Sequence, residues 1–160
     1  MLICCLLFSA IASLPAANDP VAIRFSAATI AALNDATDTT FFKIEGSPPP
    51  GRFLKKGKKF DLSELQGWLQ KQRKDEKKLS SSAYLGFKDI LFDPGNHYQG
   101  IFNVFIPSTC AIAFRSKGTT GYIVIYQYEL IAIVWEGRWE AALLNDTGRK
   151  LLEQWNNENG

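Results

Sequence analysis

The sequence is poor in the residues on which most catalytic and metal centres depend. It has three cysteines and a single histidine, His97, in 160 residues. Because a zinc site takes three or four ligands, mostly of these two types, so small a set predicts no metal site. There is also no glycine-rich phosphate loop and no GxSxG motif. We therefore expect no cofactor and no serine-hydrolase centre.

Long apolar runs are missing as well. No stretch reaches the roughly 20 apolar residues that a membrane-spanning helix needs, so we expect no transmembrane span in the mature protein. The short run Leu2–Phe8 is followed by Ala10-Ile11-Ala12, an A-x-A cleavage pattern, although no basic residue precedes Arg24. We predict that residues 1–17 are a signal peptide, that the protein is exported to the periplasm or the exterior, and that residues 18–160 form one domain. A short buried N-terminal helix is the alternative.

Positive charge is concentrated in one part of the chain. Residues 52–78 contain ten basic and four acidic residues, a net charge of +6, whereas the rest contains eight basic and twelve acidic residues and carries −4. A basic segment on a mildly acidic body favours anionic partners, so we call residues 52–78 the basic span and predict that it is a contact surface. Its expected binding residues are Arg52, Lys55, Lys56, Lys58 and Lys59.

An anionic component of the cell envelope suits this span, because clusters of roughly four to eight basic residues bind acidic lipid surfaces and wall polymers would attract them in the same way. A protein partner stays open, and so does a purely solubilising role for the charges. Nucleic acid is not expected, since the sequence has no base-reading motif and the protein is predicted to be exported.

Helices are predicted in three places. Ser26 can cap a helix over residues 27–37, and Asn145 or Asp146 can cap a last helix. Between them, Asp61-Leu62-Ser63-Glu64 has the spacing of a capping box and an apolar stripe follows it. We expect this middle helix to continue, almost wholly charged, from Lys71 to Lys78 and to end at residues 80–82.

Short β runs are predicted elsewhere. Residues 39–46 form the first strand, and from Tyr84 onward we expect strands at residues 86–92, 101–107, 110–116, 122–126 and 130–135. The last two lie in GYIVIYQYELIAIVW, whose one charge is Glu129 and which would be about 50 Å long as a single strand. Two strands with a reversal at residues 127–129 fit a small domain better, although a bulge in one longer strand is the alternative. The fold class is therefore α+β: a single domain with an antiparallel meander and about three helices, and the uniformly apolar strands are expected to be covered on both faces.

The second half of the chain also resembles a set of small, exported, uncharacterised bacterial proteins. Their pattern is a proline-flanked strand, a hairpin reading Ile-Cys-Phe-x-Cys and a final helix with Gly-x-x-x-Leu. The counterparts here are residues 105–107, 111–114, 124–128 and 148–152. The resemblance implies export and the same fold. Ile125 and Tyr128 replace the two cysteines, so no metal or redox role of those cysteines carries over.

Cys110 and His97 are the two residues from which nucleophilic chemistry could be built. A thiolate–imidazolium pair would need the fold to bring them together. Cys110 is the one cysteine left after removal of residues 1–17, so it cannot form an internal disulfide. It begins an apolar strand, where a free cysteine usually acts as a small buried hydrophobe. His97 follows a polar turn, where a histidine usually lies on the surface.

Three functions are consistent with this sequence. The one we favour is a non-enzymatic binding domain of the envelope or exterior. The first alternative is a small hydrolase or transferase that uses a Cys110–His97 pair. The second alternative is an immunity or inhibitor protein, a role that suits small exported α+β domains but for which no particular residue argues.

Overall fold

The computed structural model describes residues 24–45, 62–73, 75–98 and 108–160. Its elements are α2 (Ala27–Asn34), β1 (Thr37–Lys43), α4 (Leu62–Gln72), β2 (Lys77–Lys78), α5 (Ser81–Phe92), the 3-10 turn η1 (Pro94–Asn96), β3 (Ser108–Ser116), β4 (Thr119–Tyr126), β5 (Leu130–Trp135), β6 (Arg138–Leu143) and α6 (Asp146–Asn159). No helix in these ranges is long and apolar enough to cross a membrane.

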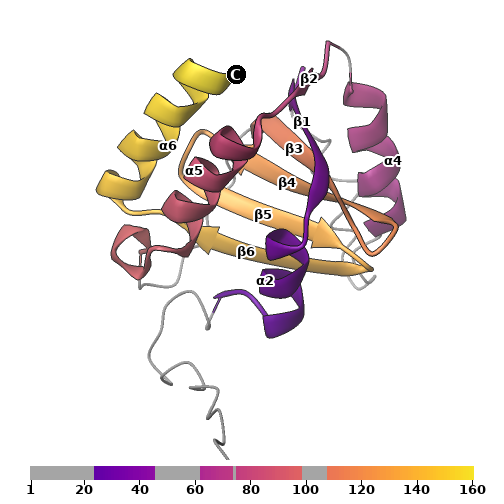
Figure 1. The fold of residues 1–160 in the computed structure, drawn as a ribbon, viewed down its shortest axis with the longest axis horizontal. Helices are drawn as coiled ribbons and strands as arrows, with labels where there is room; N and C mark the ends of the chain where they lie inside the picture. The colour runs from indigo at the N-terminus through magenta and orange to yellow at the C-terminus, as the bar shows by residue number, and fades with distance from the viewer. Residues whose placement is uncertain (1–23, 46–61, 74, 99–107) are drawn as a thin grey trace, which may run out of the picture.

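The strands form one antiparallel sheet in the order β2-β1-β3-β4-β5-β6 (Figure 1). β3 to β6 follow one another as a meander, in which Ile112 lies opposite Ile123 and Ile123 opposite Ile133. β1 returns to pair with β3 on one side and β2 on the other. The predicted α+β fold is confirmed, and the described residues contain four helices rather than about three.

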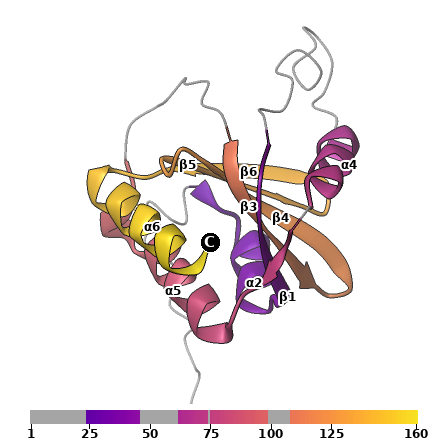
Figure 2. The same cartoon turned by 90° about the horizontal axis from the view of Figure 1, so that it is seen from above.

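Both faces of the central strands are buried, because successive side chains of a strand point to opposite sides of the sheet. Five isoleucines face α2, α5 and α6: Ile112, Ile123, Ile125, Ile131 and Ile133. On the other face, Leu65 and Leu69 of α4 pack against the smaller side chains of Ala111, Ala113 and Val124. Figure 2 shows α5 and α6 together on one side of the sheet, well separated from α4. The sheet is therefore the middle layer of the domain.

The predicted reversal at residues 127–129 is confirmed. Glu129 N–H donates to Tyr126 O at 3.0 Å, and Gln127 and Tyr128 have φ angles of 47° and 62°. These left-handed positions usually hold Asn or Gly, as Gly118 and Gly137 do in the other two hairpin turns. A tertiary contact accounts for the tyrosine, since its hydroxyl accepts a hydrogen bond from Asn156 Nδ2 at 3.0 Å.

The structure corrects the prediction for the middle helix. α4 ends at Gln72 instead of continuing to Lys78, and Lys77–Lys78 form the edge strand β2 opposite Phe41 and Thr40. Leu79 N–H then donates to Thr39 O at 2.9 Å. Pairing with β1 gives this backbone hydrogen bonds that outweigh the weak helix preference of a charged stretch with no apolar face.

The structure also corrects the prediction of a strand at residues 86–92, which belong to the helix α5. Ser80 begins this helix: its hydroxyl accepts a hydrogen bond from Ala83 N–H. Tyr84, Phe87 and Leu91 are buried at helical spacing, i, i+3 and i+7. β6 is a further strand that the sequence pattern did not indicate, and the strand expected at residues 101–107 lies outside the described residues.

Two glycines provide a test of this packing. A Cβ on Gly121 would lie 2.7 Å and 2.9 Å from Phe114 Cε1 and Cε2, whereas one on Gly67 would meet nothing within 4 Å. We expect Gly121→Ala to lower the free energy of unfolding by about 1–3 kcal/mol through overpacking. The same change at Gly67, in the exposed interior of α4, should raise it by about 1 kcal/mol through helix propensity. Urea unfolding of both variants measures the two signs, and a neutral Gly121→Ala would contradict the close fit of β3 to β4.

Candidate functional site

Cys110 lies in the core on β3 and faces the end of α6. It is 2% exposed, and its thiol donates to Asn156 Oδ1 at an Sγ–Oδ1 distance of 3.7 Å. Burial raises the pKa of this thiol to about 11. Because the reactive form of cysteine is the thiolate, this position favours an inert side chain.

His97 is also in the core, contrary to its expected place at the surface. It is 4% exposed, its Nε2 lies 2.6 Å from Leu91 O, and its ring meets the edge of Phe25 at a centroid distance of 6.4 Å. Its backbone forms a β-bridge with Leu144. These contacts join the end of α5 to the start of α6, so the histidine has a structural role in the packing of these helices.

The structure does not bring Cys110 and His97 together. Asn96, next to His97, packs against Gly148 in the first turn of α6, whereas Cys110 contacts Asn156 near its other end. The eight residues between these two contact points correspond to about 12 Å along a helix. A dyad needs its two side chains within hydrogen-bond reach, whereas Cys110 has Asn156 as its partner and His97 Nε2 has Leu91 O. The described structure therefore offers no geometry for a Cys–His dyad.

The five predicted binding residues of the basic span lie outside the described residues. What the structure describes is the C-terminal part of that span. Lys77 and Lys78 are exposed on the edge strand β2, and Lys71 is exposed in the last turn of α4. Arg73 differs, since it forms an ion pair with Glu76 and donates to Thr40 Oγ1 at 3.3 Å. This end of the span thus presents lysines to the solvent at one edge of the sheet.

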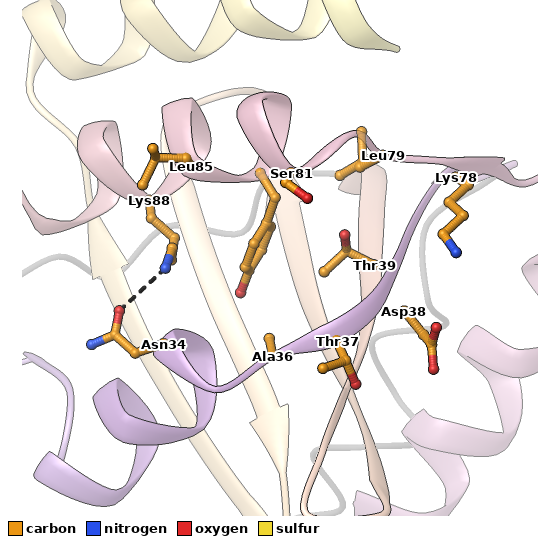
Figure 3. Close-up of a pocket in the computed structure, with 11 residues that line it drawn as sticks. Asn34, Ala36, Thr37, Asp38, Thr39, Lys78, Leu79, Ser81, Leu85 and Lys88 are labelled. Carbon is orange, nitrogen blue, oxygen red and sulfur yellow. Dashed lines mark hydrogen bonds between the residues drawn. The ribbon is translucent and has the colours of Figure 1, made fainter.

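A cleft of about 490 Å³ lies beside this edge, and sequence reasoning did not find it. It is bounded by the end of α2, the first half of β1, Lys78 of β2 and the first turns of α5 (Figure 3). Besides Tyr84, seven polar side chains line it: Asn34, Thr37, Asp38, Thr39, Lys78, Ser81 and Lys88. Its size is typical of small-molecule sites. The one sequence signal was the density of hydroxyl residues at 37–40 and 80–82.

Lys88 is held at one end of the cleft. Its Nζ donates to Asn34 Oδ1 at 3.4 Å and lies 5.5 Å from the centre of the Tyr84 ring. The Tyr84 hydroxyl in turn donates to Leu33 O at 3.0 Å, in the last turn of α2. These contacts join α2 to α5 and place an ammonium group at the mouth of the cleft.

A β-bulge shapes the other end of the cleft. Thr37 pairs with Arg115 and Thr40 with Ala113, so β1 carries one extra residue between these pairs. Asp38, inside the bulge, has a φ of 50°. Bulges often re-aim a side chain next to a site. Here Asp38 and Lys78 lie at the same end of the cleft, opposite Lys88 and Asn34 (Figure 3).

The pH dependence of stability tests the inert role of Cys110. Its thiol ionises near pH 9.0 when unfolded and near pH 11 when folded. As the pH rises, the thiol loses its proton first in the unfolded chain. The contribution of the thiol to the free energy of unfolding is therefore fully present below pH 9 and is lost between pH 9 and 11. Two pKa units correspond to about 2–3 kcal/mol. We expect the difference in unfolding free energy between wild type and Cys110→Ala to shrink by about this amount from pH 8 to pH 11.

Alkylation of the thiol provides the matching kinetic check. We expect Cys110 to react only as fast as the protein opens, with urea accelerating the labelling in step with unfolding. Tyr84 and the partly buried Tyr126, whose pKa values burial also raises, contribute equally to the pH dependence of the unfolding free energy in wild type and in Cys110→Ala. Rapid labelling of the folded protein at pH 7 would contradict the inert role.

No known protein family, curated protein or solved structure matches this chain. The resemblance to the exported bacterial set therefore stays a prediction. The function has to be argued from the protein's own charges, contacts and cleft.

Proposed function

We propose that this protein is exported and acts as a non-enzymatic binding domain, which contacts a phosphate-bearing component of the cell envelope through its basic span. The observation that carries the proposal is the charge separation: the span holds a net charge of +6 and the rest of the chain −4. Such a separation orients the protein toward an anionic surface.

The described end of the span supports this proposal. Lys71, Lys77 and Lys78 are exposed, and no ion pair involves them among the described residues. Each lysine or arginine close to an anionic surface contributes about 1 kcal/mol of binding free energy. The hydrolase or transferase alternative loses its best residue pair, because Cys110 and His97 are buried and tied to other partners.

Charge reversal in the basic span tests the proposal. We expect the full chain to bind phosphatidylglycerol vesicles or soluble poly(glycerol phosphate), and to ignore phosphatidylcholine vesicles. Replacing Lys55, Lys56, Lys58 and Lys59 by Glu should weaken this binding by more than about 4 kcal/mol, since attraction becomes repulsion at four positions. Raising the salt concentration should weaken wild-type binding steeply, which separates it from apolar adsorption of the N-terminus.

The matched control reverses four exposed basic residues elsewhere: Lys43, Arg115, Lys117 and Lys150. It changes the net charge by the same amount and should retain most of the binding. Binding to vesicles alone identifies a lipid head group, and binding to the polymer alone identifies a wall component. If neither binds, or if both variants lose binding equally, the proposal is wrong. Loss of residues 1–17 from the protein recovered outside the cytoplasm tests the export.

A further inference from the structure

We propose that the cleft between β1 and α5 is a second site, which binds a small phosphate ester of a polyol. This site shares Lys78 with the end of the basic span, but its other groups, Thr39, Ser81, Asp38 and Lys88, lie outside that span. Together with Lys78 they come from the three elements β1, β2 and α5. The argument starts from Thr39, the least exposed polar side chain of the cleft.

Thr39 is 7% exposed, and its hydroxyl has no hydrogen-bond partner among the described residues. The hydroxyl oxygen is not one of the fully enclosed polar atoms that lack a partner, so it is open to the cleft. Figure 3 shows this hydroxyl directed into the cleft on the side of Ser81. A valine would fill the same space in the strand without offering a hydrogen-bonding group. This hydroxyl is therefore available to a partner that comes from outside the chain.

The N-terminus of α5 opens onto the same place. This helix has 12 residues, and its cap Ser80 takes the N–H groups of Ala83 and Tyr84 through its hydroxyl and carbonyl oxygens. The N–H groups of Ser81 and Ser82 are those that a helix leaves without an acceptor of its own. Ser81 lines the cleft. The positive end of the helix dipole and these donors favour an anion there.

The number of donors around the cleft favours phosphate over carboxylate. The hydroxyls of Thr39 and Ser81, the N–H group of Ser81, and the ammonium groups of Lys78 and Lys88 make five donor groups. An ionised carboxylate has about four lone-pair sites. A phosphate has a third oxygen and a second charge to satisfy the remaining donors.

The carboxylate of Asp38 limits the choice of ligand further. A lone phosphate ion would be repelled by its carboxylate, and a cleft of about 490 Å³ is larger than such an ion needs. A carboxylate accepts hydrogen bonds from hydroxyl groups. A polyol attached to the phosphate supplies these hydroxyls and fills the end of the cleft where Asp38 and Lys78 lie. Glycerol 3-phosphate is the simplest probe with both parts.

Calorimetric titration and amide chemical shifts of the full chain test this site. We expect binding of glycerol 3-phosphate at millimolar concentrations, weaker binding of inorganic phosphate and of glycerate, and none of glycerol. The amides of Ser81, Ser82 and Thr39 should shift most. Thr39→Val and Lys88→Gln should each weaken binding about tenfold, since each removes one charge-assisted hydrogen bond. The control Lys150→Gln removes the same charge from the exposed side of α6 and should bind as wild type does.

Thr39→Val carries its own check on folding. Because it removes a hydroxyl that no described residue bonds and places valine, a good strand former, in β1, its melting temperature should equal or exceed that of wild type. Unchanged affinity in both cleft variants, equal loss in Lys150→Gln, or shifts confined to other residues would each overturn the proposal. The variant with Glu at positions 55, 56, 58 and 59 should keep the cleft site. The failure of one proposal is therefore visible separately from the failure of the other.

Discussion

The structure depends on one constraint: the strands at the centre of the sheet are apolar on both faces. Every residue of β5 is buried, and Ile123, Val124 and Ile125 of β4 are at most 1% exposed. A sheet of this kind is stable only if both faces are covered, because each exposed apolar side chain would cost about 1.5–3 kcal/mol. α2, α5 and α6 cover the face with the large isoleucines, and α4 covers the face with alanines and valines. The alternation of large and small residues along β3 thus decides which helices fit on which side.

This same packing buries Cys110 and His97, the two residues that could have served nucleophilic catalysis. Cys110 fills a position on the isoleucine face, and His97 joins the end of α5 to the start of α6. α6 lies between them, with its first turn at Asn96 and its last turns at Cys110. The groups left for function are at the edge of the covering layer. There, α2 gives way to β1, and β2 leads into α5. Polar side chains can face the solvent at such a boundary without weakening the core.

The sequence could predict those features of the site that depend on neighbouring residues, but not those that depend on distant ones. The capping serines Ser26 and Ser80 act locally, so their spacing to the next residues indicates a helix start. Ser80-Ser81-Ser82 is nevertheless ambiguous, because a run of serines can precede one helix or follow another. The cleft combines Asp38 and Thr39 with Lys88, about fifty residues further along the chain, and depends on a bulge in β1. No local sequence pattern predicts a β-bulge or the residue that will lie opposite it.

Local sequence patterns were enough to predict the fold class, the paired hairpin strands within residues 121–135, the caps of the first and last helices and the charge separation. Each of these follows from neighbouring residues, through side-chain periodicity, capping or simple counting of charges. The tertiary structure alone decided that residues 77–78 pair as a strand, that residues 86–92 are helical, that Cys110 and His97 lie apart, and that Thr39 faces a cleft. These outcomes depend on contacts between segments distant in the chain, whose free energies exceed the small local preferences of the residues involved.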